Sequence, residues 1–157
     1  MSAIEIQGLD HVVLRVADLE RSIAFYEAVL GLPVERRIDE LGLVQLRAGH
    51  SLIDLVGTDT KLGRAGGGPV APDGRNVDHF AVALPRFDEP AIRAHLEAHG
   101  VEAGDTGRRY GAQGYGPSIY IRDPDGNVVE LKGPPEPDVD VVDMKGPPDP
   151  DEGSEPS

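Results

Sequence analysis

The sequence predicts an α+β fold made of two βαβββ modules, and two observations lead to this prediction. First, an Asp-His step opens an apolar run twice, as LDHVVL at 9–14 and as VDHFAV at 77–82. Second, a strand with one carboxylate between apolar neighbours occurs twice, as LIDLVG at 52–57 and as VVELKG at 128–133. The first pattern opens and the second closes two similar halves, so a duplication explains both.

The first half, 8–57, begins with a strand, because LDHVVLRV at 9–16 alternates in polarity. A helix follows in ADLERSIAFYEAVLG, with Asp18 as its N-cap, one apolar face and Gly31 at its end. Glycines then separate three short predicted strands, at 33–39, 43–48 and 51–56.

The second half, 76–132, repeats this order after a linker at 58–75 that is rich in Gly and Pro. Its first strand is 77–84, and its helix lies in FDEPAIRAHLEAHG, where Asp88 is the expected N-cap. The remaining predicted strands are a weak one at 101–107, a strong one at 117–123 and a last one at 127–132.

The composition limits the partners of the chain. The formal net charge of the 157 residues is −13, which disfavours nucleic acid and anionic membranes, since both are bound by basic surfaces. There is no run of about eighteen apolar residues and no signal peptide is evident, so no membrane span is expected and the expected location is cytoplasmic. Cysteine is absent, which excludes disulfides and thiolate chemistry.

Residues 133–157 differ from the predicted domain at 1–132. They hold eight acidic residues against one lysine and many prolines. The repeat LKGPPEPD and MKGPPDPD, at 131–138 and 144–151, lies mostly within them. Such a composition buries too little apolar surface to offset chain entropy, so we expect a disordered acidic tail. The alternative is an interaction motif present in two copies.

Each half begins with a strand histidine and ends with a strand carboxylate. The first half supplies His11 and Asp54, and the second supplies His79 and Glu130. A helix is expected to cover one face of each sheet, and side chains two apart in a strand share a face. If all four side chains point to the uncovered faces, two imidazoles and two carboxylates converge. The alternative for each histidine is a core position with a backbone hydrogen bond.

The segments DHVVLRVADLERSIAFYEAVLGL, VDHFAV and SIYIRDPDGNVVELKG resemble the vicinal oxygen chelate superfamily. That superfamily includes glyoxalase I, methylmalonyl-CoA epimerase, extradiol dioxygenases, fosfomycin-resistance thiol transferases and bleomycin-binding proteins. The resemblance covers residues 8–133 and leaves out most of the tail. It implies the glyoxalase-like fold, in which paired βαβββ modules form a curved mixed sheet around one divalent metal ion, either Zn, Ni, Co, Mn or Fe.

The resemblance also implies metal ligands. His11, His79 and Glu130 match the ligand positions residue for residue. Asp54 departs from the pattern, because glyoxalase I has a glutamate there and epimerases have a glutamine, whereas extradiol dioxygenases use only two histidines and one glutamate. Aspartate is one methylene shorter, so direct binding requires a closer strand, and the alternative is a bridging water or a supporting role.

Four further residues are predicted to bind substrate. Arg15 has the same strand parity as His11, and the other three share a face in the second half: Ser118, Tyr120 and Arg122. The tyrosine matches one that faces the cavity in fosfomycin-modifying relatives. The alternative for these side chains is packing and solvent exposure. His50, His95 and His99 are given no role.

The resemblance implies a metal-dependent enzyme that acts on a small substrate with two adjacent oxygens. The leading hypothesis is glyoxalase I-like lyase or isomerase chemistry through an enediolate, with Glu130 as both ligand and general base. If Asp54 does not bind the metal, a two-histidine, one-carboxylate site for an Fe(II)-dependent extradiol-type dioxygenase remains. A third alternative is a metal-free, ligand-sequestering resistance protein. A homodimer is expected, with the half-sites taken from one chain or from two.

Overall fold

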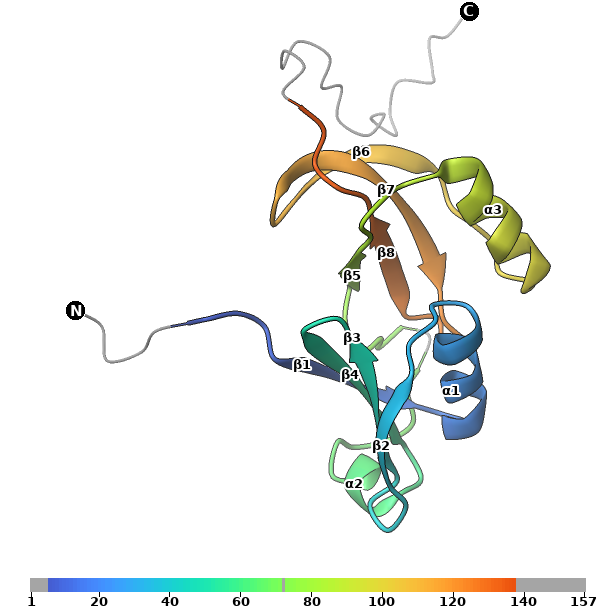
Figure 1. The fold of residues 1–157 in the computed structure, drawn as a ribbon. Helices are drawn as coiled ribbons and strands as arrows, with labels where there is room; N and C mark the ends of the chain where they lie inside the picture. The colour runs from blue at the N-terminus through green and yellow to red at the C-terminus, as the bar shows by residue number, and fades with distance from the viewer. Residues whose placement is uncertain (1–5, 72, 138–157) are drawn as a thin grey trace, which may run out of the picture.

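The computed structural model describes residues 6–71 and 73–137, and it contains two four-stranded sheets (Figure 1). In the first sheet the strand order is β1-β4-β3-β2, with β1 parallel to β4 and the other pairs antiparallel. The elements of this module are β1 (His11–Val16), α1 (Leu19–Ala28), β2 (Val34–Ile38), β3 (Leu43–Ala48) and β4 (Ser51–Gly57).

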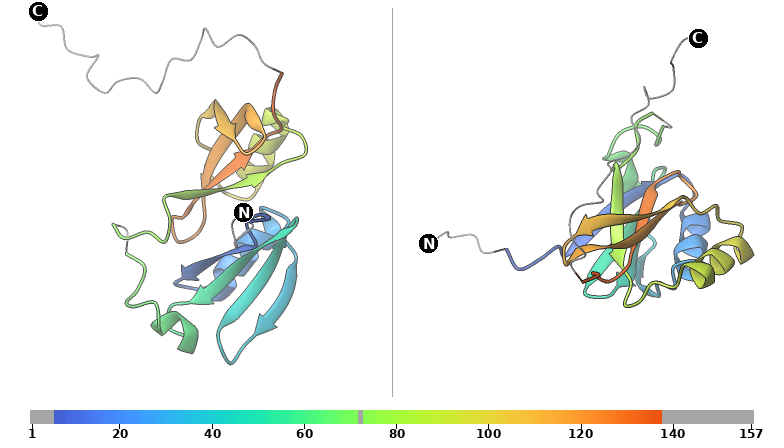
Figure 2. Two further views of the ribbon diagram at one scale, coloured as in Figure 1. Left: turned by 90° about the vertical axis from the view of Figure 1, so that its left-hand side faces the viewer. Right: turned by 90° about the horizontal axis from the view of Figure 1, so that it is seen from above.

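The second sheet repeats this plan in the order β5-β8-β7-β6, with β5 parallel to β8. Its elements are β5 (His79–Ala83), α3 (Glu89–Ala98), β6 (Thr106–Gly111), β7 (Gly114–Arg122) and β8 (Val128–Lys132). The linker carries the short helix α2 (Lys61–Arg64) and runs from the first sheet back to β5 (Figure 2). The α+β prediction of paired βαβββ modules is confirmed.

Both long helices start at the predicted caps. Asp18 Oδ1 accepts a hydrogen bond from the Arg21 amide at 3.0 Å, and Asp88 Oδ1 accepts one from the Ala91 amide at 3.1 Å. Gly31 follows α1 with a φ of +67°, a conformation that favours glycine. No helix within the described residues is long and apolar enough to cross a membrane.

The second and third strands of the second module differ from the prediction. The expected weak strand at 101–107 starts only at Thr106, and β6 and β7 form a hairpin in which Tyr110 pairs with Tyr115. β7 therefore begins at Gly114, before the predicted start at 117. The run of glycines concealed this hairpin, because glycine is depleted in strands and its presence there reflects close approach of other groups.

One face of each sheet is buried under helices α1 and α3, which lie on the same side of the two sheets (Figures 1 and 2). The first core cluster contains Leu14, Val16, Val44, Leu46, Ile53 and Leu55, and the second contains Leu96, Ile119, Ile121, Val129 and Leu131. Phe25 of α1 and Leu30, two residues after the end of this helix, pack against both clusters. The two modules are thus joined through their helix-covered sides, and the other face of each sheet, called the open face below, is covered by neither α1 nor α3.

A polar clamp joins α1 to the turn between β7 and β8. The buried Tyr26 hydroxyl donates to Asp123 Oδ2 at 2.8 Å, and Ser22 Oγ donates to Asp125 Oδ2 at 3.2 Å. Asp123 Oδ1 accepts from the Asn127 amide of its own turn at 2.8 Å. Burial, followed by the Asp123 charge, raises the pKa of Tyr26 above its ordinary value, so the phenol remains a donor.

The first residues of the predicted tail continue alongside β7. The Gly133 amide donates to Pro117 O at 2.8 Å, and the Glu136 amide donates to Tyr115 O at 2.8 Å. Arg108 Nε also lies 3.2 Å from Glu136 Oε2. Residues 138–157, which carry the second GPP copy and most of the predicted disorder, lie outside the described residues.

Candidate metal centre

Strand alternation places the predicted ligands on the open faces. In β8, Val129 and Leu131 enter the core, so Glu130 between them points to the other face. In β4, Ile53 and Leu55 do the same on either side of Asp54. Asp54 pairs with Val13 and Glu130 pairs with Ala81, each two residues along the parallel strand from a histidine. Each module therefore presents an imidazole beside a carboxylate.

The C-terminal pair consists of His79 and Glu130. His79 Nε2 lies 3.5 Å from Glu130 Oε2. The histidine is exposed, whereas the glutamate is 7 % exposed and its Oε1 makes no hydrogen bond to described residues. A buried carboxylate oxygen thus lies beside an accessible imidazole nitrogen.

The N-terminal pair consists of His11 and Asp54. Asp54 is 4 % exposed, and its Oδ2 accepts a hydrogen bond from Gln45 Nε2 at 2.9 Å, across the β3–β4 ladder. Its Oδ1 accepts no hydrogen bond from described residues. The hydrogen bond to Asp10 raises the pKa of the exposed His11, and the Asp54 charge acts in the same direction.

The two unpartnered oxygens are the test of whether a metal fits. Among the described residues, Asp54 Oδ1 and Glu130 Oε1 are the only buried side-chain nitrogen or oxygen atoms without a hydrogen-bond partner. Leaving such a group unsatisfied costs about 1–3 kcal/mol, and more when it is charged. Carboxylate oxygens and imidazole nitrogens are ligands of divalent cations. The donor set therefore fits a divalent metal ion.

Two aspartates that the sequence interpretation left without a role support the histidines. His11 Nδ1 lies 2.6 Å from Asp10 Oδ1, and His79 Nδ1 lies 2.6 Å from Asp78 Oδ1. With the proton on Nδ1, each ring donates to its aspartate and leaves the Nε2 lone pair free, as in carboxylate–histidine–metal arrangements. The hydrogen bond to His79 lowers the pKa of Asp78. The repeated Asp-His step was the signal for this support.

The structure brings the four predicted ligands together as two pairs. Within residues 6–71 and 73–137 of a single chain, no group of three or more His, Cys, Asp or Glu side chains is placed to hold a metal. Within the described residues, the N-terminal pair and the C-terminal pair are therefore separate groups. The convergence of all four side chains in one site stays a prediction.

The predicted substrate residues lie in different surroundings. Arg15 binds the linker, because its guanidinium donates to the carbonyls of Gly63, Gly67 and Gly68 at 3.2, 2.8 and 2.7 Å. Arg122 donates to Gly126 O in the β7–β8 turn at 3.1 Å.

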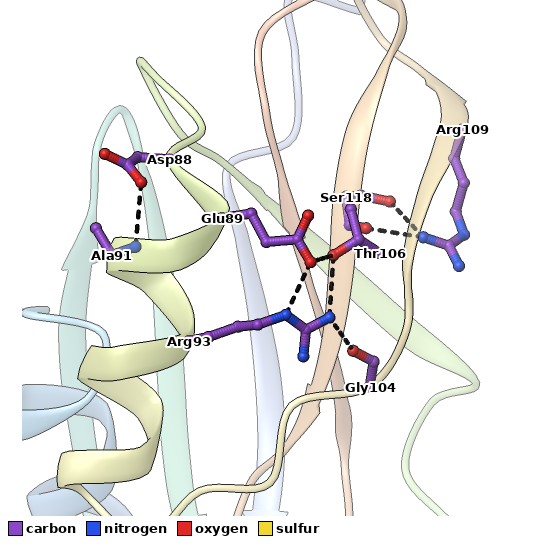
Figure 3. Close-up of polar contacts among 8 residues, drawn as sticks. All are labelled: Asp88, Glu89, Ala91, Arg93, Gly104, Thr106, Arg109 and Ser118. Atoms are coloured by element: carbon purple, nitrogen blue, oxygen red, sulfur yellow. Dashed lines mark hydrogen bonds and ion pairs between the residues drawn. The ribbon is translucent and has the colours of Figure 1, made fainter.

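Tyr120 instead lies next to the C-terminal pair, and Ser118 lies two residues before it in β7. The Tyr120 ring meets the His79 ring edge to face, with a centroid distance of 5.5 Å. Arg109, to which the sequence interpretation assigned no direction, lies over the Tyr120 ring at 4.4 Å. Its Nη1 donates to Ser118 Oγ at 2.9 Å (Figure 3). The position of Arg109 depends on the pairing of β6 with β7, which the sequence interpretation did not predict.

Comparison with known proteins shows what the chain is similar to. It is 28 % identical over 126 residues to the glutathione transferase FosA of Serratia marcescens, covering 80 % of each chain. It is 31 % identical over 122 residues to a catechol-2,3-dioxygenase of Bacillus subtilis, covering 75 % of this chain and 38 % of the relative.

Among solved structures, an integron cassette protein from the mobile metagenome of V. cholerae superposes with a TM-score of 0.64 at 32 % identity. The match covers 84 % of this chain and 98 % of that protein. The family model described as the Glyoxalase/Bleomycin resistance protein/Dioxygenase superfamily matches residues 8–131. The chain belongs to the Glyoxalase/Bleomycin resistance protein/Dioxygenase superfamily.

Proposed function

We propose that the chain is a metal-dependent enzyme of the vicinal oxygen chelate type, with lyase or isomerase chemistry like that of glyoxalase I. One observation supports the metal dependence most directly: the two unpartnered buried oxygens belong to the two predicted ligand carboxylates. The superfamily contains both enzymes and ligand-sequestering proteins. The named relatives are a transferase and a dioxygenase, so the comparisons leave the reaction open.

The proposed ligands are His11, Asp54, His79 and Glu130, and the ion is Zn, Ni, Co, Mn or Fe. A divalent cation held there supplies a Lewis acid for two adjacent substrate oxygens, which makes a neighbouring carbon-bound proton easier to remove. Glu130 is the proposed base, because one of its two carboxylate oxygens can bind the metal while the other accepts a proton. Tyr120 packs against His79 and limits the ring's orientation.

We also propose that the site is completed in a homodimer. One chain would supply the N-terminal pair and a second chain the C-terminal pair, since a single chain holds them as separate half-sites. β1 and β5 are edge strands within the described chain, so each has an unpaired side beside its histidine. A two-fold axis that brings these edges together would unite both pairs twice.

The proposal is tested by metal content and turnover. The purified full chain, stripped with chelator and reconstituted anaerobically with each candidate metal, is assayed against α-ketoaldehyde hemithioacetals and catechols. Bound metal with turnover of a hemithioacetal supports the proposal, and His50→Ala serves as a control that keeps both. A protein that takes up no divalent metal but binds small ligands would instead be a sequestering protein.

The second candidate is an Fe(II)-dependent extradiol-type dioxygenase. Gln45 favours it, because its hydrogen bond holds one oxygen of the short Asp54 side chain toward β3. If Asp54 stays outside the coordination shell, Asp54→Ala leaves metal affinity within a few-fold and the iron form consumes O₂ with a catechol. If Asp54 is a ligand, the same change weakens affinity by roughly tenfold or more, and Asp54→Glu preserves it.

A further inference from the structure

A row of polar side chains extends the C-terminal pair across the open face of the second sheet. Tyr120 pairs with Glu130 across the β7–β8 ladder, and Ser118 pairs with Lys132. Residues two apart in a strand share a face, so Lys132 lies about 7 Å along β8 from Glu130 on the same side. Arg109 joins the row from β6, through its contacts with Tyr120 and Ser118.

Lys132 is a buried cation without a counter-ion. The residue is 9 % exposed, and its Nζ makes no ion pair with any described residue. Its one hydrogen bond there goes to Gly133 O at 3.4 Å, which is long for an N–H···O contact. Burying an ammonium without compensation is costly, so an anion at this point would stabilise the folded protein. Once a metal ion neutralises the charge of Glu130, the positive charge of Lys132 is balanced even less.

Arg109 supplies a second cation with free donors. Nη1 is used by the carbonyl and hydroxyl of Ser118, at 3.0 and 2.9 Å, but Nε and Nη2 make no hydrogen bond to described residues. Glycines make room for both cations. A Cβ on Gly107 would lie 2.8 Å from the Arg109 guanidinium carbon, and one on Gly111 would lie 3.0 Å from Lys132 Cε. Larger residues would displace these side chains from the sheet.

We propose that Lys132, Arg109 and Ser118 form a subsite for a small oxyanion, a carboxylate, phosphonate or phosphate group carried by the substrate. A hydroxyl, a guanidinium and an ammonium on one face suit the several acceptor oxygens of such a group. The inference rests on the proposed function and deepens it: the substrate has two adjacent oxygens at one end and an anionic group at the other. Arg109 and Lys132 would then determine specificity.

The test measures anion binding by the metal-free full chain, so that it does not depend on the metal. Calorimetric titration with inorganic phosphate is expected to show binding that Lys132→Met and Arg109→Gln each weaken by about tenfold or more, the range for a hydrogen bond to a charged group. Arg108→Gln is the matched control, since Arg108 pairs with Glu136 instead. Lys61→Met controls for a lysine on an exposed surface. Lys132→Arg should restore binding, which separates loss of charge from loss of fold.

The outcomes separate this inference from the proposed function. A parallel titration with acetate tells a carboxylate subsite from a phosphate or phosphonate subsite, by which anion depends on Lys132. Glu130→Gln should lose metal and keep or strengthen anion binding, because a nearby negative charge is removed. The subsite proposal is wrong if neither anion binds, or if both anions bind Lys132→Met as tightly as they bind wild type. Lys132 would then only balance the charge of Glu130. If the chain takes up no metal but binds an anion in a way that depends on Lys132, the subsite proposal is supported and the proposed metal-dependent activity is contradicted.

Discussion

Asp54 and Glu130 are two residues that lower the free energy of unfolding of the metal-free protein. Each buries a carboxylate oxygen that no described residue satisfies, although an amide or a hydrocarbon at the same place would cost less. Other buried carboxylates show the contrast, since both oxygens of Asp123 accept hydrogen bonds. A ligand carboxylate has this character because its partner is the metal.

The first prediction follows from that cost. Glu130→Gln should not lower the melting temperature of the metal-free protein, since the change removes a buried charge that lacks a full set of partners. It should abolish the rise in melting temperature when metal is added, which for wild type corresponds to about 2.7 kcal/mol at a hundredfold excess over Kd. Differential scanning calorimetry with and without chelator measures both effects.

The exposed Glu97 on α3 provides the control. Glu97→Gln should keep the full metal-dependent rise. A metal-free Glu130→Gln protein that melts well below wild type would mean that the carboxylate supports the fold, and would contradict its assignment as a ligand.

At the scale of elements, the clamp between α1 and the β7–β8 turn is the clearest stabilising contact between the modules. Tyr26→Phe removes the hydroxyl that donates to Asp123 and leaves a buried charged acceptor with one fewer donor. The free energy of unfolding should fall by about 1–3 kcal/mol. That corresponds to a drop in melting temperature of about 2–4 °C per kcal/mol for a domain of this size. Tyr110→Phe changes an exposed hydroxyl and should have no measurable effect.

A second contact between elements predicts a dependence on pH. Glu89 at the start of α3 accepts hydrogen bonds from Thr106 at 2.6 Å and from Arg93 at 2.8 Å (Figure 3), and these lower its pKa below the ordinary value of 4.5. A carboxyl whose pKa is lower in the folded state stabilises the fold above its unfolded pKa, and this stabilisation is lost as the pH falls through the folded pKa.

Glu89→Gln should therefore lower the stability at neutral pH, with the difference from wild type closing as the pH falls below 4.5. Urea denaturation from pH 7 downward measures the difference. Glu97→Gln, whose side chain makes no hydrogen bond to described residues, should track wild type throughout. A difference between Glu89→Gln and wild type that is constant with pH would mean that helix packing, and not the charge, is responsible.

The elements also show what local patterns predict. The caps at Asp18 and Asp88 depend on neighbouring residues alone, and the faces of Asp54 and Glu130 follow from alternation within a strand. The β6–β7 hairpin could not be predicted in this way, because Gly107 and Gly111 are explained by Arg109 and Lys132, which lie against them in the folded chain. The hydrogen bond of Tyr26 could not be predicted for a similar reason, since its partner Asp123 is distant in the sequence.

The candidate site was predictable to the same extent. The histidines and carboxylates were found as a repeat, and the two supporting aspartates were visible in it. The hydrogen bonds of Arg15 were not predictable. Strand parity gives the face of the sheet on which a side chain lies, but it does not show that the linker carbonyls fold back over that face. Parity alone also cannot tell whether two half-sites meet within a chain or between chains.

At the scale of the whole molecule, the proposed homodimer makes a prediction about mixed chains. His11→Ala and Glu130→Ala should each be devoid of tight metal binding. After the two are mixed, denatured and refolded together, a site shared between chains should recover about one quarter of the wild-type sites, because half of the dimers are mixed and each has one site with both defects and one with neither.

Metal content of the refolded mixture measures the recovery, and a mixture of His79→Ala with Glu130→Ala is the control. Those two changes lie in the same half-site, so each site of the mixed dimer carries one defect and none is restored. If the first mixture also recovers nothing while both proteins are folded and dimeric, the half-sites come from one chain.

The clamp also bears on how the two halves have diverged. The turn before β8 carries Asp123 and Asp125, which receive the polar groups of α1. The corresponding turn before β4 consists of Gly49 and His50 and offers α3 no carboxylate. Two copies of the first module in tandem would bury Tyr26 without an acceptor, and two copies of the second would leave the aspartates without their donors. The two modules are thus complementary at this contact and are not interchangeable.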